Sequence, residues 1–243
     1  MTTPEFVVRP DKGSLAALVG DRLIRELAPL TAEGGEAHLS LTGGSMGIAT
    51  LAAVSAHVDR DEVAWSRVHF WWSDERFVAR ADGERNSLQA RDALLDALDV
   101  PDVNVHEPWS IEDGSLDDAA RAYADELAAF GGDHGAYPAF DVCLLGVGPD
   151  AHIASLFPGR DEIHEVDAVV LPVRNSPKPP PERVTFTLPV INASARVWLV
   201  VAGADKAEAV EKVRRGPDPD AAPASMARGL IETIVFADEA AAG

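Results

Sequence analysis

The sequence predicts an α/β protein with a doubly wound, mostly parallel sheet flanked by helices. Short apolar runs rich in β-forming residues recur along the chain, and Ala-rich segments with helical spacing lie between them. The two kinds of segment alternate from one end of the sequence to the other. Strands that alternate with helices pair in parallel, because a parallel connection needs a crossover that a helix can supply.

Four apolar runs are the strongest strand candidates: residues 39–42, 68–72, 140–145 and 196–202. Three weaker candidates are residues 169–173, 184–188 and 232–236, of which we expect the first and the last at an edge of the sheet. The helices expected between the strands are residues 14–28, 46–57, 86–98, 116–130 and 205–215.

Two proline-rich segments interrupt the alternation. Residues 175–183 contain four prolines and residues 216–223 contain three, so both are expected to be loops. The sequence shows no repeat and no convincing linker. Its 243 residues, 47% of them hydrophobic, are enough to build one core, and we expect a single domain spanning 1–243.

The composition excludes several classes of partner. A formal net charge of −19 disfavours binding to nucleic acids, which depends on clustered Lys and Arg. No signal-like or membrane-spanning stretch is visible, and the single cysteine, Cys143, lies in an apolar run where packing explains it. We therefore expect a cytoplasmic protein without membrane or nucleic acid partners. An anionic substrate would have to be held by a few local cations.

Ligands of open α/β sheets bind beyond the carboxyl ends of the strands, so the residues that follow each apolar run are the first candidates for a site. After residues 39–42 the chain reads Gly43-Gly44-Ser45 and enters a helix. Glycines let the backbone approach a ligand closely, and the N–H groups at a helix start favour a phosphate. The spacing matches neither a dinucleotide-binding fingerprint nor a Walker loop, and a plain turn explains it as well.

Acidic and basic residues follow the strand expected at 68–72. Asp74, Glu75 and Arg76 could orient substrate hydroxyls or stabilise a developing charge, whereas a surface ion pair in a solvated loop is the alternative. Asn86 and Ser87 come ten residues later at a predicted helix start, where helix capping is the simpler role.

A Gly-rich turn presents a histidine after the strand expected at 140–145. Gly146 and Gly148 precede Asp150 and His152, so a carboxylate stands two residues before an imidazole that suits a general base. The other histidines show no metal-ligand spacing, and we predict no metal site. They are residues 38, 57, 69, 106, 134 and 164.

Cations follow two further strands. Arg174 and Lys178 lie in the first proline-rich segment, and Lys206 comes just after the strand expected at 196–202. Each of them could hold a phosphate, although solvent exposure explains any one of them alone. Four loops at the same edge of the sheet strengthen the case for a shared site.

The order of these motifs resembles the 6-phosphogluconolactonase family, within a larger group that includes glucosamine-6-phosphate isomerases and deaminases. The resemblance runs in order through segments 42–45, 72–76, 146–159, 176–180, 183–185 and 203–207. In the motif at 146–159, Ala151 replaces a glycine of the family pattern, and Ser73 stands where glycine is frequent. If the family glycine at position 151 has a positive φ, the alanine in its place lowers the stability of the fold by about 1 kcal/mol or shifts the loop.

The resemblance implies a modified Rossmann-like fold and the hydrolysis of 6-phospho-D-glucono-1,5-lactone without metal or organic cofactor. It implies that His152 activates water and that Asp150 orients His152 or contacts the substrate. It also implies that Arg76 contacts the lactone oxygens or the developing charge. Asp74 lies where the related deaminases carry an acid/base group. The resemblance assigns the phosphate to Gly43, Gly44, Ser45, Arg174, Lys178 and Lys206, with Arg183 as another candidate in place of Arg174.

Two other functions remain open at this point. A glucosamine-6-phosphate deaminase would carry a Glu after the histidine to assist ring opening, and this chain has no carboxylate between His152 and Asp161. A noncatalytic sugar-phosphate sensor would not need a base, so the presence of His152, Asp74 and Arg76 disfavours it. We expect a monomer, or at most a weak dimer.

Overall fold

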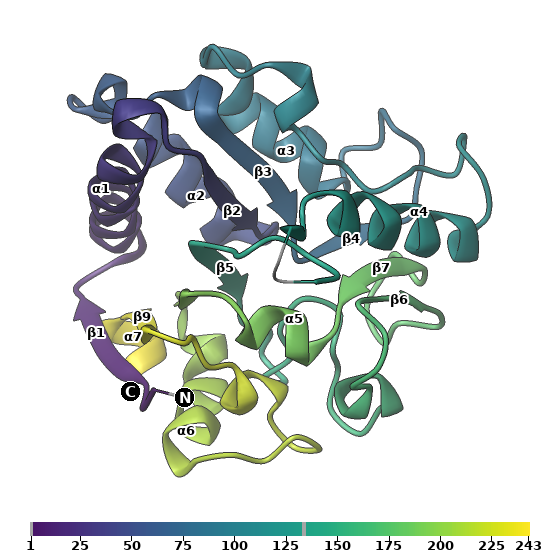
Figure 1. Cartoon of the computed structure of the whole chain (residues 1–243). Helices are drawn as coiled ribbons and strands as arrows, with labels where there is room; N and C mark the ends of the chain where they lie inside the picture. Colours follow the sequence, from purple (N-terminus) through teal and green to yellow (C-terminus); the bar gives the residue numbers. More distant parts are fainter. Residues whose placement is uncertain (1, 133–134) are drawn as a thin grey trace.

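The larger of two sheets is six-stranded and parallel throughout (Figure 1). The computed structural model describes residues 2–132 and 135–243, so His134 lies outside the described residues. In spatial order the strands are β1 (Glu5–Arg9), β9 (Glu232–Asp238), β8 (Arg196–Val201), β5 (Val142–Gly146), β2 (Ala37–Leu41) and β3 (Val68–Trp72).

Helices cover both faces of this sheet, as a doubly wound fold requires. One core contains side chains of α1 (Lys12–Thr31), α2 (Gly44–Ser55) and α3 (Asn86–Ala93). The opposite core contains side chains of α4 (Leu116–Ala129), α5 (Leu188–Asn192), α6 (Ala207–Arg215) and α7 (Glu239–Ala242). Along β8, Trp198 faces the first core and Val197 the second. Burial on both faces explains why the central strands read as unbroken apolar runs.

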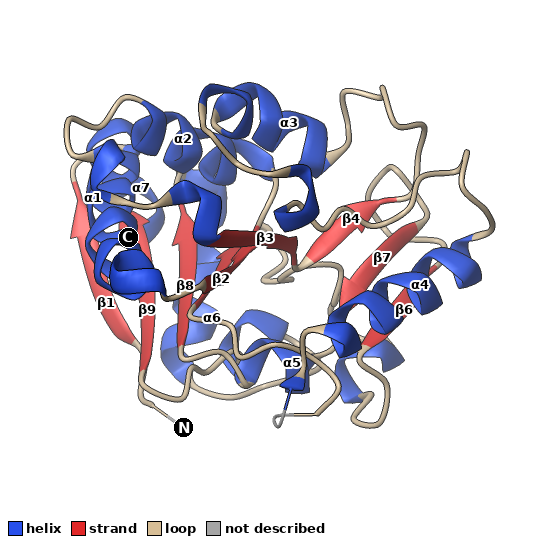
Figure 2. Cartoon of the chain, turned by 45° about the horizontal axis from the view of Figure 1, so that its top comes forward, coloured by secondary structure: helices blue, strands red, loops and turns tan. Residues whose placement is uncertain are grey.

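A second sheet has three antiparallel strands in the order β4 (Asp74–Arg76), β7 (Arg183–Phe186) and β6 (Val170–Val173). Figure 2 shows it beside the larger sheet, with α4 lying along it. One residue, Ser73, separates β3 of the first sheet from β4 of the second. The residues of the Ser73–Arg76 segment are therefore placed where the two sheets meet.

The structure confirms the doubly wound class and all seven predicted strands, and it adds two strands. β1 and β4 were not predicted. The expected edge position is correct for β6 but wrong for β9, because β1 pairs in parallel with the outer side of β9.

The five predicted helices are present, and one of them is shorter than expected. α3 ends at Ala93 because Leu94 leaves the helical region, with φ −148°, and the chain continues as a 3₁₀ turn at Leu95–Ala97. The proline-rich segments lie outside helices and strands over residues 175–182 and 216–222.

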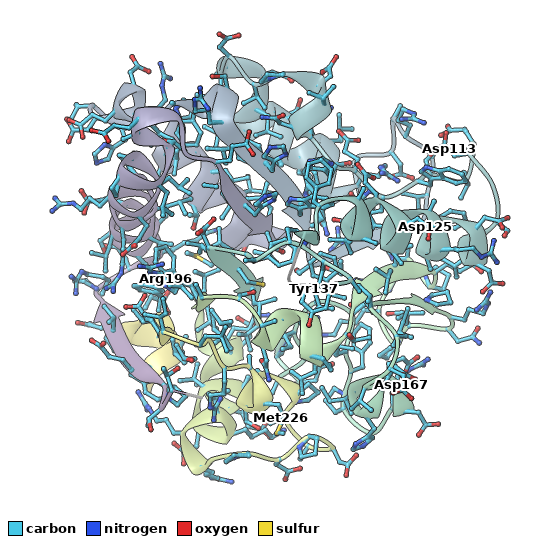
Figure 3. The ribbon with its side chains drawn as sticks, in the orientation of Figure 1. Asp113, Asp125, Tyr137, Asp167, Arg196 and Met226 are labelled. Carbon is cyan, nitrogen blue, oxygen red and sulfur yellow. The ribbon has the colours of Figure 1, made fainter. Side chains whose placement is uncertain are left out.

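Charged side chains give the molecule an acidic exterior. Asp113, Asp125 and Asp167 are exposed and project outward from the ribbon (Figure 3). Cys143 is buried in β5, where burial raises the pKa of its thiol to about 12. Within residues 2–132 and 135–243, no helix combines the length and apolar character that a membrane span requires.

Candidate active site

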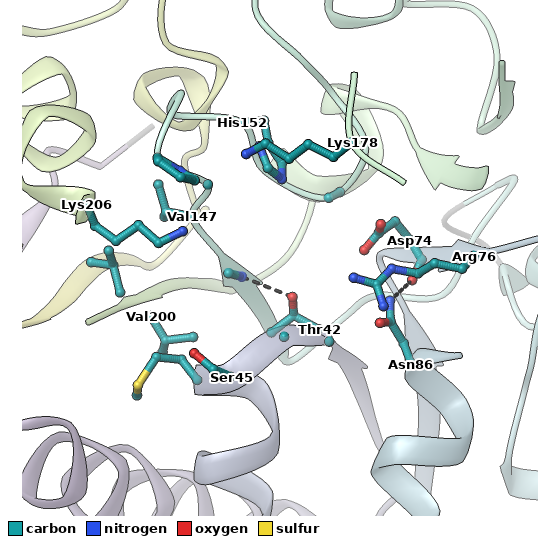
Figure 4. A pocket seen from close by; sticks show the side chains of 18 of the residues that line it. Thr42, Ser45, Asp74, Arg76, Asn86, Val147, His152, Lys178, Val200 and Lys206 are labelled. Atoms are coloured by element: carbon teal, nitrogen blue, oxygen red, sulfur yellow. Dashed lines mark hydrogen bonds between the residues drawn. The ribbon is translucent and has the colours of Figure 1, made fainter. Parts of the chain in front are cut away.

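A cavity of about 450 Å³ opens at the carboxyl ends of β2, β5 and β8 and beside β4. The loops that follow these strands supply its walls, as the sequence predicted. In Figure 4, Lys206 and Ser45 lie on one side of the cavity and Asp74, Arg76 and Asn86 on the other, with His152 and Lys178 above them. The cavity therefore has one end near the start of α2 and another near β4.

The first wall is the turn from β2 into α2. Gly44 has φ +76°, a conformation that favours glycine, and a Cβ on Gly43 would stand 1.8 Å from Asn86 Oδ1. Thr42 Oγ1 accepts a 3.0 Å hydrogen bond from the backbone N–H of Gly146, which joins the loop after β2 to the end of β5. The missing side chain of Gly43 makes room for Asn86, whereas a Cβ on Gly44 would meet nothing within 4 Å, so the α2 start is open to a ligand, with Ser45 beside it.

The turn after β5 builds a histidine–aspartate pair. His152 Nδ1 lies 2.5 Å from Asp150 Oδ1, and the imidazole packs against the Phe157 ring with 4.6 Å between centroids. The pair fits only because Gly148 lacks a side chain, since a Cβ there would stand 2.0 Å from His152 Nδ1. Ala151, between the two residues, has φ +68° and is fully buried. It therefore adopts the left-handed conformation that its replacement of a family glycine suggested.

The ionisation of Asp150 determines which nitrogen of the His152 imidazole carries the hydrogen. Burial alone would raise the pKa of Asp150, but the hydrogen bonds and charges of His152 and Lys178 hold that pKa well below its usual range. An ionised carboxylate can only accept hydrogen bonds, so Nδ1 must carry the hydrogen of the 2.5 Å contact. Nε2 of His152 is then left with a free lone pair, as a general base requires.

Lys178 also contacts this pair. Its Nζ donates to Asp150 Oδ1 at 3.1 Å and lies 3.3 Å from His152 Nδ1. The sequence placed Lys178 at a phosphate, and the structure does bring it to the cavity. Its ammonium is nevertheless directed to the histidine–aspartate pair.

Asp74 is held at the opposite side of the cavity by two buried partners. Ser155 Oγ donates a 2.7 Å hydrogen bond to Asp74 Oδ2, and Arg183 Nη1 lies 3.7 Å from the same oxygen. Within the described part of the chain, Asp74 Oδ1 has no hydrogen-bond partner. That oxygen is available to a substrate hydroxyl.

Glu75 has a structural role, although it stands between two cavity residues. Its carboxylate accepts backbone hydrogen bonds from Arg76, Asn86 and Ser87 at 2.7–2.8 Å, and so caps the start of α3. Complete burial raises the pKa of Glu75, an effect that Arg85 at 3.9 Å and these N–H groups oppose. The side chain does not line the cavity.

Arg76 and Lys206 bring positive charge to the cavity from different elements. Arg76 Nη1 donates a 2.6 Å hydrogen bond to the Glu84 carbonyl, which fixes the guanidinium beside Asp74. Lys206 lies at the end of the 3₁₀ turn after β8, and burial lowers the pKa of its ammonium. The described residues contain no cluster of His, Cys, Asp and Glu suited to a metal ion.

A family model described as glucosamine-6-phosphate isomerases/6-phosphogluconolactonase matches residues 10–235. The chain belongs to this family. It is 45% identical over 246 residues to a 6-phosphogluconolactonase of Streptomyces coelicolor, covering 99% of this chain and 94% of the relative.

Solved structures place the chain in the same family fold. A 6-phosphogluconolactonase from Trypanosoma brucei superposes with a TM-score of 0.86 at 26% identity, covering 100% of this chain and 98% of the other. A monomeric glucosamine-6-phosphate deaminase superposes with a TM-score of 0.79 at 20% identity, covering 98% of both chains. The second likeness concerns the fold alone, so the fold does not separate lactonases from deaminases within this family.

One residue that the family resemblance assigned to the site lies outside the cavity. Arg174 is half exposed, and its Nη2 lies 2.7 Å from Asp117 Oδ2 at the start of α4. Arg183, the other candidate, lines the cavity and is 4% exposed. Arg174 directly follows β6 and pairs with Asp117 at the α4 surface, so its role at the phosphate stays a prediction.

Two further polar residues, Asn86 and Ser155, help to build the cavity and were not predicted to do so. Asn86 lines it and donates a 2.8 Å hydrogen bond to the Asp74 carbonyl, in addition to starting α3. Ser155 reaches Asp74 from the loop after β5. Ser155 belongs to the same 146–159 motif as His152, which is the signal that could have pointed to it. Its partner Asp74 lies 81 residues away in the sequence, so the spacing of residues within the motif could not predict their contact.

Proposed function

We propose that this protein hydrolyses 6-phospho-D-glucono-1,5-lactone to 6-phospho-D-gluconate, the lactone-opening step of the oxidative pentose phosphate pathway. The observation that carries this proposal is the His152–Asp150 pair, with a 2.5 Å contact, facing a cavity whose far side carries a Gly-rich helix start and Lys206. A base at one wall and an anion site at another match a substrate with a reactive carbonyl and a phosphate. Family membership and the lactonase relatives support the same reaction.

His152 acts as the base in this mechanism. Nε2 takes a proton from a water molecule while the water oxygen bonds to C1 of the lactone, and Asp150 stabilises the imidazolium that forms. The tetrahedral intermediate then breaks its bond to the ring oxygen. His152 returns the proton to that oxygen, which becomes the C5 hydroxyl, and the new carboxylic acid ionises. Water is thereby added across one C–O bond and the enzyme is regenerated.

The wall around β4 supports the reacting end of the substrate. Arg76 supplies positive charge for the oxyanion that develops on the C1 oxygen. Asp74 is anchored through Oδ2 by Ser155, so Oδ1 can accept a hydrogen bond from a sugar hydroxyl. We assign Asp74 to orienting the ring rather than to proton transfer.

The phosphate occupies the α2 end of the cavity. Backbone N–H groups at Gly44 and Ser45 begin a helix whose dipole favours an anion, and Lys206 adds a positive charge from the loop after β8. Gly44, where a Cβ would meet nothing within 4 Å, permits the close approach that a phosphate needs, and Gly43 leaves room for Asn86 beside it. This mechanism uses no metal or organic cofactor. The proposed enzyme is a single domain, residues 1–243, that acts as a monomer in the cytoplasm.

A deaminase is the second candidate from the same fold. The segment after His152 opposes it, because Ile153, Leu156 and Phe157 are buried and apolar where ring opening would need an acid. A noncatalytic sugar-phosphate sensor is the third candidate. It gives no reason for the pairing of Asp150 with His152.

A direct assay separates these three functions. The purified protein should accelerate loss of 6-phosphogluconolactone above its spontaneous hydrolysis and release no ammonia from glucosamine 6-phosphate. His152→Ala should lower turnover by about 100-fold or more while the protein stays folded and still binds 6-phosphogluconate. Ammonia release would favour the deaminase, and binding of 6-phosphogluconate without hydrolysis of the lactone would favour the sensor.

A further inference from the structure

Lys178 and His152 share one oxygen of Asp150. Oδ1 accepts from His152 Nδ1 at 2.5 Å and from Lys178 Nζ at 3.1 Å, and the two nitrogens are 3.3 Å apart. A phosphate-binding lysine would be expected to direct its ammonium to the empty part of the cavity. Lys178 directs it to the base instead.

The backbone around Lys178 is fixed by a buried guanidinium. Arg183 Nη2 donates 3.1 Å hydrogen bonds to the carbonyls of Lys178 and Pro179, and its Nε donates to Pro180 at 3.1 Å. Arg183 is 4% exposed, packs over the Phe157 ring and pairs with Asp74. The backbone position of Lys178 is therefore fixed by the fold, and from it the side chain, which is 36% exposed, reaches Asp150.

We propose that Lys178 is a positioning residue that keeps His152 in its unprotonated, basic form. The inference rests on the proposed function and changes the role of a residue expected to hold phosphate. A carboxylate beside an imidazole favours the imidazolium, which cannot accept a proton from water. An ammonium that already neutralises the carboxylate, and lies beside the ring, opposes this second positive charge.

The other charges near the imidazole do not supply this effect by contact. Asp74, Arg76, Arg183 and Lys206 line the same cavity, and the neutral Phe157 ring covers one side of His152. Among charged side chains of the described residues, those within hydrogen-bonding or ion-pairing distance of the imidazole are Asp150 and Lys178. Removal of Lys178 would leave the carboxylate to act on His152 alone.

The test is Lys178→Met, which removes the charge. Lys178→Arg keeps the charge at the same position, and Lys212→Met removes a lysine charge on α6 as a matched control. Lys212 pairs with Glu208 outside the cavity. In Lys178→Met, the acid limb of the kcat/KM profile should move to higher pH by about one unit, so activity near pH 6 falls about tenfold and is largely restored as the pH rises. Lys178→Arg and Lys212→Met should keep the acid limb close to its original position.

A second readout does not depend on turnover. The pH titration of the His152 imidazole by NMR, assigned by its absence in His152→Gln, should move to higher pH in Lys178→Met. An unmoved titration and an unmoved acid limb, with KM raised at every pH, would overturn the proposal and assign Lys178 to phosphate binding. If the protein failed to hydrolyse the lactone but the titration still moved, the proposed function would fail and the role of Lys178 would stand.

Discussion

Ser155 Oγ donates a 2.7 Å hydrogen bond to Asp74 Oδ2, joining the loop after β5 to the first residue of β4. Both side chains are buried, with 0% of Ser155 and 6% of Asp74 exposed. The bond links the segment that carries the proposed base to the segment proposed to orient the sugar. A neutral hydroxyl outside the cavity lining thereby holds one of the cavity's carboxylates in place.

Ser155→Ala should weaken both the fold and the activity. Loss of a hydrogen bond to a buried carboxylate costs about 1–3 kcal/mol in the free energy of unfolding, and a displaced Asp74 should lower kcat/KM about tenfold. Urea unfolding and lactonase kinetics measure the two effects. Ser66→Ala, at an exposed serine, is the control. Unchanged kinetics in Ser155→Ala would show that Asp74 does not depend on this bond.

Asp150→Asn should disable the base while leaving the cavity intact. The amide can donate to Nδ1, which would place the imidazole hydrogen on Nε2 and remove the lone pair that takes the proton from water. We expect kcat/KM to fall by about 100-fold or more, with a smaller change in KM. Asp125→Asn, at an exposed position on α4, serves as the matched control. Activity within threefold of the original would place the essential interaction elsewhere.

Ala151→Gly should have little effect, although Ala151 has φ +68°. Relief of left-handed strain contributes about 1–2 kcal/mol, whereas loss of a buried methyl costs about 0.8 kcal/mol and the greater freedom of glycine costs about 0.5–1 kcal/mol. These effects nearly cancel, so the free energy of unfolding should change by less than about 1 kcal/mol.

Ala151→Val is the informative contrast at this position. A β-branched side chain at positive φ in a fully buried site should cost more than about 2 kcal/mol and displace the neighbouring Asp150 and His152. Thermal unfolding and kcat/KM would record both losses. A stable and active Ala151→Val protein would show that the turn can adopt another conformation.

The stability of the fold should depend on pH through His38. Burial, with the charges of His69 and His106, lowers the pKa of His38 from 6.5 to about 4. Between these two pH values the unfolded chain binds a proton at this site that the folded protein does not. Stability from His38 is therefore full above pH 6.5 and is lost as the pH falls toward 4, by about 2 kcal/mol for a partly exposed ring.

Urea unfolding at several pH values between 4.5 and 7.5 would measure this dependence. His38→Gln should flatten it, because the amide oxygen can accept the hydrogen bond that Trp71 Nε1 gives to His38 Nδ1 at 3.1 Å and does not titrate. An equally steep dependence in the variant would assign it to other groups, such as His69, whose pKa burial also lowers.

The central strands of the main sheet could be predicted because they are buried on both faces and therefore read as apolar runs. β4 could not, since its sequence Asp74-Glu75-Arg76 has no strand-forming character and its conformation comes from pairing with β7. β1 was missed for a similar reason, because two of its five residues are charged and its partner β9 lies at the other end of the chain.

The residues of the candidate site that follow strands could be predicted from the sequence. His152, Asp74, Arg76, Ser45 and Lys206 all follow strands, and the structure brings them to one cavity. The direction of a cation within a long loop was not predictable from sequence. Arg174 turns to Asp117, whereas Lys178 turns to Asp150, and this choice depends on which carboxylate the folded chain brings near.

The connection between the two sheets, which is the single residue Ser73 between β3 and β4, also affects how the molecule folds. Cavity contacts join residues far apart in sequence: Ser155 with Asp74 across 81 positions, and Gly146 with Thr42 across 104. Contacts between such distant parts of the sequence slow folding, because the two segments must meet before their interactions are gained. A fragment ending before β5 would keep Asp74 and Arg76 but lack the partners that hold them. Activity should therefore emerge late in refolding, when both sheets have closed around Ser73.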